Sequence, residues 1–232
     1  MKKIVKGTSL QNFEQWKNDN ATTIANMFAV GENGSDLWSF FKSSAKQIFK
    51  DTRLQILEEQ FYLCAYCNRK IHVDSTRIDD RYTTLNHVVP KSSNPENLTF
   101  DYNNLVASCD GARKEPRPRN LHCDAQKNNN TILVSPLQFD CEDLIYYTSN
   151  GDISGISSAI TDNLNEILGL NCSKLKNERE NTIKGYIEDP DTADGLIDIP
   201  TAQELLESIN QNPPFEYSSA IASVLKREIL SL

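Results

Sequence analysis

Four cysteines in the sequence have the spacing of a metal site. Cys64 and Cys67 form a CxxC knuckle, and Cys109 and Cys123 follow further along the chain. Four thiolates suit one tetrahedral structural zinc ion, and its binding would stabilise a segment too rich in loops to be held by core burial alone. The spacing therefore predicts one structural zinc. The alternatives are four unrelated buried thiols, or a thioredoxin-like redox use of the knuckle, although no βαβ pattern surrounds it.

The other two cysteines, Cys141 and Cys172, lie outside this spacing, and we expect both to be small packed side chains. The start of the sequence has basic residues but no apolar run long enough for a signal-peptide core, and no later stretch approaches a membrane span. We therefore expect a cytoplasmic protein, in which clustered cysteines bind metal rather than form disulfides.

A histidine in an apolar, strand-like segment lies between the cysteine pairs. This residue, His87, belongs to residues 85–91, and residues 103–109 and 122–127 add amide, histidine and acidic side chains. Alone, such a histidine would be an ordinary structural residue, but the side chains of these neighbouring segments favour a catalytic role. Its unperturbed pKa of about 6.5 suits proton transfer near neutral pH, and acidic side chains can bind a hard divalent cation.

The order of these segments resembles the HNH (ββα-metal) nuclease family. That family has a CxxC knuckle, a histidine followed by a proline, an Asn-Leu pair before a cysteine, and a final Cys-His-x-x-Lys. The matching residues here are Cys64 and Cys67, His87 to Pro90, Asn104-Leu105, Cys109, and Cys123 to Lys127. The resemblance implies that His87 is the general base and that Asn104 braces the ββα turn. It also implies that Asp124 binds a catalytic Mg²⁺ or Mn²⁺ ion, which would neutralise charge during phosphodiester hydrolysis.

The sequence departs from the family pattern near the expected cation. Asn86 stands where the family more often has an acidic residue, so the cation ligand there would be a weaker neutral carbonyl, or the cation would bind mainly through Asp124 and the phosphate. Asp124 replaces the usual final histidine, and His122 is a rival ligand. Asn86 also keeps open an alternative function, a zinc-stabilised binding or scaffold subunit with a weakened site.

Charge is divided unevenly along the 232 residues. The net charge is −8, but residues 1–130 carry +3 and residues 131–232 carry −11. Phosphate binding depends on Lys and Arg, so the front part is the expected nucleic-acid side. The acidic part is either an ordinary solvated helical surface or a face for a partner protein.

A basic segment stiffened by prolines, residues 112–120, is inserted between Cys109 and Cys123. It is either a solvated loop or a phosphate-contacting finger. The expected nucleic-acid contacts are Lys91, Arg113, Lys114, Arg117, Arg119 and Lys127.

A wider likeness joins the HNH pattern to Ile4-Val5-Lys6-Gly7 and to Leu168-Gly169-Leu170-Asn171 with Leu175 and Arg179. With these segments the chain resembles the HNH subunit of Septu and retron-associated anti-phage defence systems. The resemblance implies an effector nuclease of a defence complex, acting on DNA or RNA with an ABC/SMC-like ATPase partner. The sequence has no Walker-type loop, so any ATP use would belong to that partner.

The elements expected to hold these residues form an α+β fold. Helical periodicity covers residues 10–70, with one start at Ser35-Asp36 and another at Asp51-Thr52. Strands are predicted at 83–89, 105–107 and 131–134, and a hairpin at 144–153 turns at Asn150-Gly151. Helical patterns return beyond residue 157, with one helix ending at Asp189-Pro190. The prediction is a ββα-metal core with structural zinc at 61–130, between a helical region at 1–60 and a hairpin plus acidic helices at 131–232.

Overall fold

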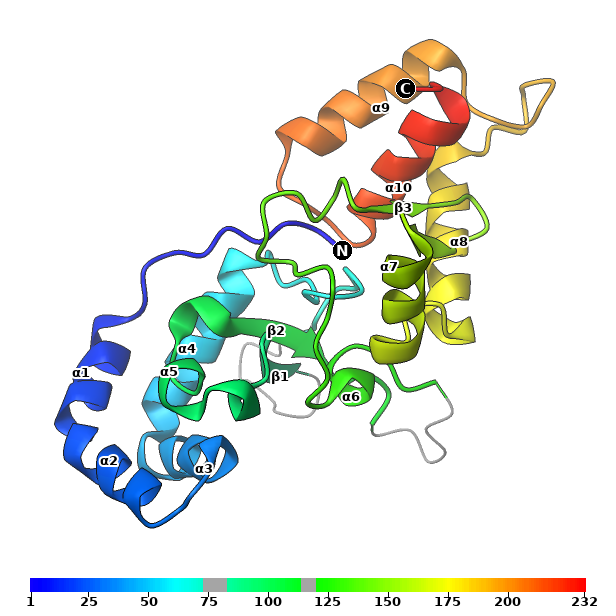
Figure 1. Ribbon diagram of the computed structural model, residues 1–232. Helices are drawn as coiled ribbons and strands as arrows, with labels where there is room; N and C mark the ends of the chain where they lie inside the picture. Colours follow the sequence, from blue (N-terminus) through cyan, green and yellow to red (C-terminus); the bar gives the residue numbers. More distant parts are fainter. Residues whose placement is uncertain (73–82, 114–119) are drawn as a thin grey trace.

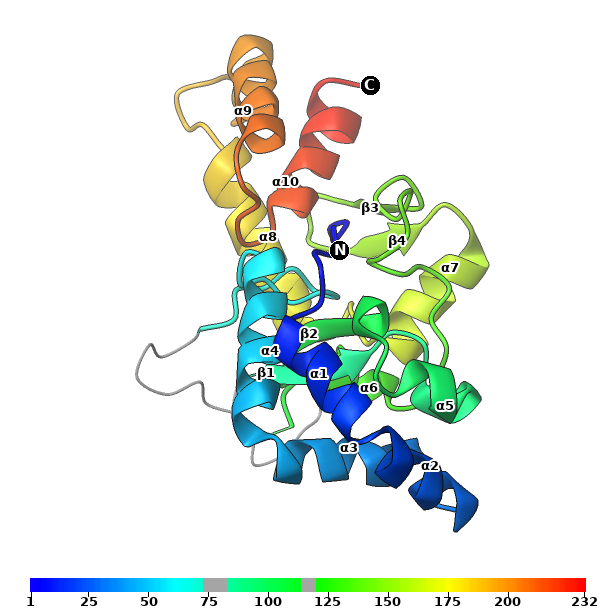
Figure 2. The same cartoon turned by 90° about the vertical axis from the view of Figure 1, so that its left-hand side faces the viewer.

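The computed structural model describes residues 1–72, 83–113 and 120–232. Two small antiparallel hairpins carry the strands of the described part, and helices surround them (Figure 1). The N-terminal helices lie at one end of the molecule and helices α8 to α10 at the other, with the first hairpin between them in both side views (Figure 2). This arrangement agrees with the predicted α+β class.

Four helices form the N-terminal end: α1 (Gln11–Asp19), α2 (Ala21–Ala29), α3 (Gly34–Ser44) and α4 (Lys46–Glu59). Helix α3 begins at a capping box, in which the Asn33 side chain accepts from the helix backbone and the Asp36 carboxylate accepts from the Asn33 N–H. The predicted start at Asp51-Thr52 is wrong. Thr52 is a buried residue inside α4, and its hydroxyl donates to the Ile48 carbonyl at 2.8 Å.

Aromatic rings hold these helices together. Phe41 packs against Phe13 with ring centroids 5.2 Å apart and against Trp16 at 4.6 Å. Trp38 from the same helix reaches Phe100, which lies in the segment between the strands of the first hairpin. The aromatic cluster therefore ties the N-terminal helices directly to the central hairpin.

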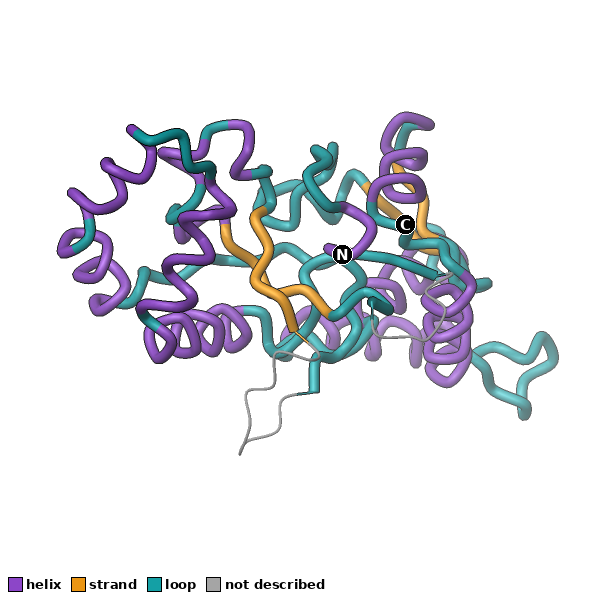
Figure 3. The backbone as a smooth tube through the Cα atoms, turned by 90° about the horizontal axis from the view of Figure 1, so that it is seen from below, coloured by secondary structure: helices purple, strands orange, loops and turns teal. Residues whose placement is uncertain are grey.

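The central hairpin supplies the two β elements of the predicted ββα core. Strands β1 (Thr83–His87) and β2 (Leu105–Cys109) pair antiparallel, with His87 opposite Leu105. The segment between them holds three short elements: η1 (Lys91–Ser93), α5 (Pro95–Leu98) and η2 (Tyr102–Asn104). The α element is the single-turn helix α6 (Asp124–Lys127). Strands at both predicted places are confirmed, and they run through the middle of the molecule seen from below (Figure 3).

The second hairpin also follows the sequence. Strands β3 (Ile145–Tyr147) and β4 (Ile153–Gly155) pair across the predicted turn, where Gly151 has φ +80°. The strand predicted at 131–134 is wrong. There the side chain of Asn163 accepts from the Leu133 N–H at 2.8 Å and donates to the Thr131 carbonyl at 3.4 Å, so backbone groups that a neighbouring strand would pair are bound by one amide.

The C-terminal end consists of α7 (Ser158–Asp162), the π-helix η3 (Asn163–Ile167), α8 (Ser173–Ile187), α9 (Ile199–Gln211), α10 (Ser218–Val224) and the π-helix η4 (Leu225–Ile229). Helix α8 ends just before Asp189-Pro190, as predicted. The buried guanidinium of Arg179 in α8 donates to the carbonyls of Gly151 and Leu170, which fastens the helix to the second hairpin. None of the helices in the described ranges combines the length and hydrophobicity needed to cross a bilayer.

A close approach at Gly169 joins the C-terminal region to the segment before α6. Gly169 has φ +60°, and a Cβ added there would lie 2.5 Å from the Leu121 carbonyl oxygen. Next to it, the Cys123 N–H donates to the Leu168 carbonyl at 2.7 Å. The absence of a side chain at residue 169 is therefore what lets the two segments touch.

We expect Gly169→Ala to lower the free energy of unfolding by about 2–4 kcal/mol, because left-handed backbone strain and a backbone clash add together. Gly195→Ala is the matched control, since Gly195 has φ +73° but nothing within 4 Å of an added Cβ. It should lose only the strain, about 1 kcal/mol. Urea unfolding of both variants measures the difference, and equal losses would show that the approach at Gly169 does not matter.

Candidate active site and metal centre

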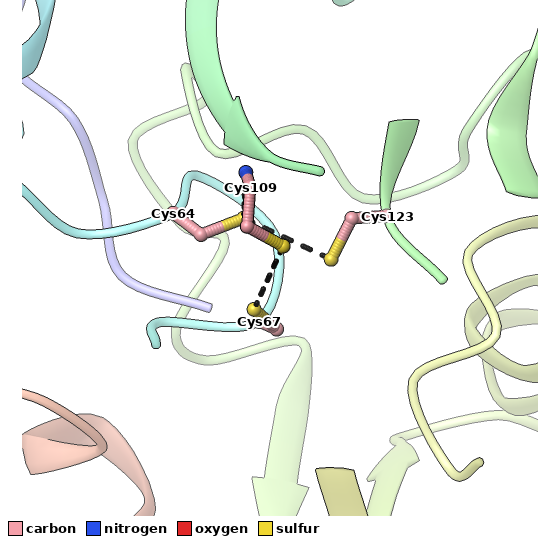
Figure 4. Close-up of side chains that lie close together, drawn as sticks. All are labelled: Cys64, Cys67, Cys109 and Cys123. Carbon is pink, nitrogen blue, oxygen red and sulfur yellow. Dashed lines mark hydrogen bonds between the residues drawn. The ribbon is translucent and has the colours of Figure 1, made fainter. Parts of the chain in front are cut away.

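The four predicted zinc ligands converge in the structure. The sulfur atoms of Cys64, Cys67, Cys109 and Cys123 all lie within 4.8 Å of one another, and all four residues are buried. The Cys64 and Cys123 sulfurs are 3.7 Å apart, and those of Cys67 and Cys109 are 3.9 Å apart. Sulfurs placed about 2.3 Å from a tetrahedral zinc are about 3.8 Å from each other, so the spacing fits this metal. Figure 4 shows the four side chains meeting from the knuckle, from the end of β2 and from the residue before α6.

The backbone holds the knuckle in this shape. The Cys64 N–H donates to the Arg69 carbonyl at 2.8 Å, and the Asn68 N–H donates to the Cys64 carbonyl at 3.0 Å. Asn68 takes a left-handed conformation with φ +63°, which asparagine tolerates better than most residues. Leu63 and Lys70 form a bridge that closes the turn. The knuckle therefore presents both of its sulfurs to the same side.

Hydrogen bonds from the other thiols lower the pKa of the Cys64 thiol, but the cluster requires a positive charge to hold all four residues as thiolates. Burial and the neighbouring thiols raise the pKa of the Cys123 thiol well above its ordinary value. A bound cation reverses that effect, because it stabilises the deprotonated form. The convergence of the sulfurs excludes four unrelated thiols and agrees with a structural zinc site. Cys141, buried, and Cys172, half-buried, lie outside the cluster as expected.

His87 lies at the end of β1 in an orientation fixed on two sides. Its Nε2 atom is 3.0 Å from the Thr99 carbonyl oxygen, and its ring packs edge-on against Trp38 with centroids 4.7 Å apart. A carbonyl can only accept, so Nε2 carries the proton and Nδ1 keeps the lone pair. Burial lowers the pKa of His87 to about 4, so the ring is neutral near pH 7. An oriented, unprotonated imidazole is the form that a general base requires.

Asn104 joins the two sides of the loop after β1. Its side chain accepts from the Val89 N–H at 2.8 Å and donates to the Val89 carbonyl at 2.9 Å. Its own carbonyl accepts from the Val88 N–H at 2.9 Å. These three bonds hold the segment immediately after His87, which is the bracing position that the HNH resemblance implies for this asparagine.

Asp124 opens α6 and points its carboxylate at β1. One oxygen accepts from the Asn86 side-chain amide, and the other lies 3.2 Å from the Thr84 hydroxyl and 2.8 Å from the Arg113 guanidinium. Arg113 also donates to the Asp124 main-chain carbonyl at 3.2 Å. The Asn86 carbonyl oxygen accepts from the Tyr66 hydroxyl. One carboxylate with a neighbouring hydroxyl is a set of oxygen ligands that Mg²⁺ accepts together with water and substrate phosphate, but here the Arg113 guanidinium occupies the place that such a cation would take.

His122 faces the other centre. Its Nδ1 atom lies 3.1 Å from the Cys123 sulfur and 3.8 Å from the Cys109 sulfur, and the residue is fully buried. The structure therefore places His122 beside the zinc ligands and Asp124 beside Asn86. Sequence order alone left these two residues as rivals for the catalytic cation.

The predicted phosphate contacts divide into three groups. Lys91 is half-buried beside the loop after β1, and Arg113 is bound to Asp124. Lys127 is fully buried, and its ammonium donates to the His87 carbonyl at 3.0 Å, so it stabilises the end of β1 from inside and does not face solvent. Burial lowers the pKa of Lys127 to about 8. Lys114, Arg117 and Arg119 lie outside the described residues.

Sequence comparisons place this site in a class. The family model described as HNH endonuclease matches residues 63–110, which therefore form an HNH domain. The matched range contains His87, Asn104 and three of the four cysteines, and it ends before α6. The positions of Cys123 and Asp124 thus rest on the geometry described above.

Two curated relatives extend the likeness along the chain. The proposed HNH endonuclease of retron Vc95 from Vibrio cholerae serotype O1 biovar El Tor is 27% identical over 155 residues, covering 61% of this chain and 66% of the relative. The proposed HNH endonuclease of retron Ec83 from Escherichia coli is 27% identical over 194 residues, covering 67% of this chain and 73% of the relative. The chain is a distant homologue of these retron-associated proteins.

We expect one zinc ion per chain. Cys123→Ser should lose the ion, because three thiolates bind zinc far less well than four. It should also lose much of its stability, because the ion stabilises the loops that it joins. Cys141→Ala is the control, since Cys141 is equally buried but lies outside the cluster. Elemental analysis and thermal unfolding report both properties. A zinc-free parent protein would contradict the assignment.

Arg113 occupies the carboxylate that a cation would need, so we expect Arg113→Ala to bind Mn²⁺ up to about 5-fold more tightly in the absence of nucleic acid. Arg227→Ala, which removes a guanidinium stacked on Tyr146 instead, should leave Mn²⁺ affinity unchanged. Isothermal titration with MnCl₂ measures both. Unchanged affinity in Arg113→Ala would mean that the ion pair does not compete with the cation.

Proposed function

We propose that the protein is a metal-dependent HNH endonuclease that hydrolyses phosphodiester bonds in nucleic acid. The observation that carries this proposal is the state of His87: buried at the end of β1 in a matched HNH domain, it is neutral and keeps Nδ1 as its lone-pair nitrogen. The bond to the Thr99 carbonyl fixes the tautomer, so the lone pair that could take a proton from water lies on Nδ1.

His87 Nδ1 takes a proton from water as the water oxygen attacks phosphorus and the bond from phosphorus to the leaving oxygen breaks. Asp124 would hold the divalent cation, which would supply charge neutralisation on the phosphate and the leaving oxygen. Asn104 keeps the loop after His87 in place, and Lys127 fixes the His87 carbonyl. The phosphates on either side would be contacted by Lys91, Arg113, Lys114, Arg117 and Arg119.

The finer assignment is an effector nuclease subunit of an anti-phage defence complex with an ABC/SMC-like ATPase partner. Two observations support it. The relatives that the chain matches are named as retron proteins. The excess of negative charge after residue 130 is unsuited to nucleic acid and available to a protein partner. A cleavage assay with both nucleic acids distinguishes DNA from RNA as the substrate.

A second candidate function is a zinc-stabilised nucleic-acid-binding or scaffold subunit. The Asp124 carboxylate favours it in one respect, because it is already neutralised by Arg113 and its neighbour Asn86 brings no negative charge. Such a protein would bind nucleic acid with or without a divalent cation and would cleave none.

We expect His87→Ala to reduce cleavage by about 100-fold or more while zinc content and nucleic-acid affinity persist, because the change removes the base and no metal ligand. His72→Ala, at an exposed histidine, is the control and should cleave like the parent. The assay uses DNA and RNA with Mg²⁺ or Mn²⁺, with and without an ATPase partner, and thermal unfolding checks the loss of the Trp38 contact. Full activity in a folded His87→Ala protein would disprove the mechanism, and a parent that binds but never cleaves would favour the scaffold function.

A further inference from the structure

Tyr66 links the cysteine knuckle to the proposed cation site. It is the residue immediately before Cys67 in the knuckle, and it is fully buried. Its hydroxyl donates to the Asn86 carbonyl oxygen, and the Asn86 amide in turn donates to the Asp124 carboxylate. Two hydrogen bonds therefore connect a residue held between two zinc ligands with a carboxylate on α6.

The direction of this chain follows from the chemistry of its members. An ionised carboxylate only accepts, so the NH₂ group of Asn86 must face Asp124. The Asn86 carbonyl oxygen then faces Tyr66, where only a donor fits, and a tyrosine hydroxyl is one. Each group thus fixes the orientation of the next. All three residues are buried, so water has little access to replace a missing bond.

The two oxygens of Asp124 have different surroundings. The oxygen on the Asn86 side is held by the buried chain from Tyr66. The other oxygen faces the Thr84 hydroxyl and the Arg113 guanidinium, whose side chain is 41% exposed. The first oxygen is therefore anchored, and the second is the one that can exchange Arg113 for a cation.

We propose that Tyr66 is a positioning residue for the catalytic cation, acting through Asn86 on Asp124. In this arrangement Asn86 is a hydrogen-bond relay and not a direct cation ligand, which gives a reason for an amide where an acidic residue would repel Asp124. The inference rests on the proposed function, because that function makes Asp124 the cation ligand. The further consequence is that the fold of the knuckle controls the affinity of Asp124 for the cation.

The test is Mn²⁺ affinity, measured with MnCl₂ alone by electron paramagnetic resonance on the full chain. Tyr66→Phe removes only the hydroxyl, and we expect about 10-fold weaker Mn²⁺ binding, the scale on which residues behind a metal ligand act. Zinc content should remain that of the parent. Tyr217→Phe is the matched control, since its buried hydroxyl donates to the Glu178 carboxylate at 2.9 Å outside the HNH domain, and it should bind Mn²⁺ like the parent.

A double-mutant cycle separates the relay from a general loss of packing. Asn86→Leu should weaken Mn²⁺ binding by a similar factor, and adding Tyr66→Phe to it should cause no further loss, because the relay is already broken. Additive losses would overturn the proposal, as would Mn²⁺ affinity in Tyr66→Phe equal to that of the parent. If Tyr66→Phe loses zinc, Asn86→Leu decides alone, and unchanged affinity there overturns the proposal.

The result does not depend on cleavage. A protein that shows the Mn²⁺ losses and yet cleaves no nucleic acid would keep the relay and refute the proposed function. A parent that cleaves, paired with variants of unchanged Mn²⁺ affinity, would do the reverse.

Discussion

The central part of the structure depends on the convergence of four buried thiols, whose sulfur atoms all lie within 4.8 Å of one another. They come from the knuckle, from the end of β2 and from the residue before α6, and the pairing of β1 with β2 alone would leave these segments poorly joined. A cation that balanced the thiolate charge would convert this costly burial into a crosslink between them. The link continues outward, because the Cys123 N–H binds the Leu168 carbonyl and Gly169 touches Leu121. The C-terminal region is thus fastened to the same point.

The second constraint is the buried carboxylate of Asp124. A carboxylate removed from water needs donors or cations around it, and this one has an amide, a hydroxyl and a guanidinium. Three donors on one small group also fix its direction. Arg113 balances the negative charge of this carboxylate here, and a divalent cation would balance the same charge during catalysis. The ion pair and the proposed cation site therefore have the same cause, the charge of a buried carboxylate.

The sequence was informative where spacing alone determines the outcome. The cysteines, the strands of both hairpins and the end of α8 before Asp189-Pro190 were all predictable, because each depends on local chemistry or alternation. Thr52 was misjudged because a threonine can cap a helix or bond back to the preceding turn, and only the packing of α4 decides. The apolar run 131–134 has strand composition, but a side chain distant in sequence, Asn163, binds its backbone.

The separation of His122 from Asp124 shows most clearly what spacing leaves out. Only Cys123 lies between them, and it has φ +55°, a conformation that no sequence rule predicts for a cysteine. The turn at this residue sends the imidazole toward the sulfurs and the carboxylate toward β1. One backbone angle therefore decides which of the two side chains lies beside the sulfurs and which lies beside β1. The contact of Tyr66 with Asn86 was hidden for a similar reason, since nothing in a CxxC pattern says where its inner side chains point.

Helix α6 shows why so short an element can serve both parts of the site. Asp124 and Lys127 are three residues apart, so on a single helical turn their side chains project from the same face. That face lies against β1, where Asp124 meets the Asn86 side chain and Lys127 meets the carbonyl of the next residue, His87. One turn thus contacts two consecutive strand residues, Asn86 and His87, with one negative and one positive group. A longer helix would add nothing to these contacts, and a shorter one would lose the lysine. The Asp-x-x-Lys spacing is therefore set by the helical period and by the need to hold a carboxylate and a histidine in a fixed relation.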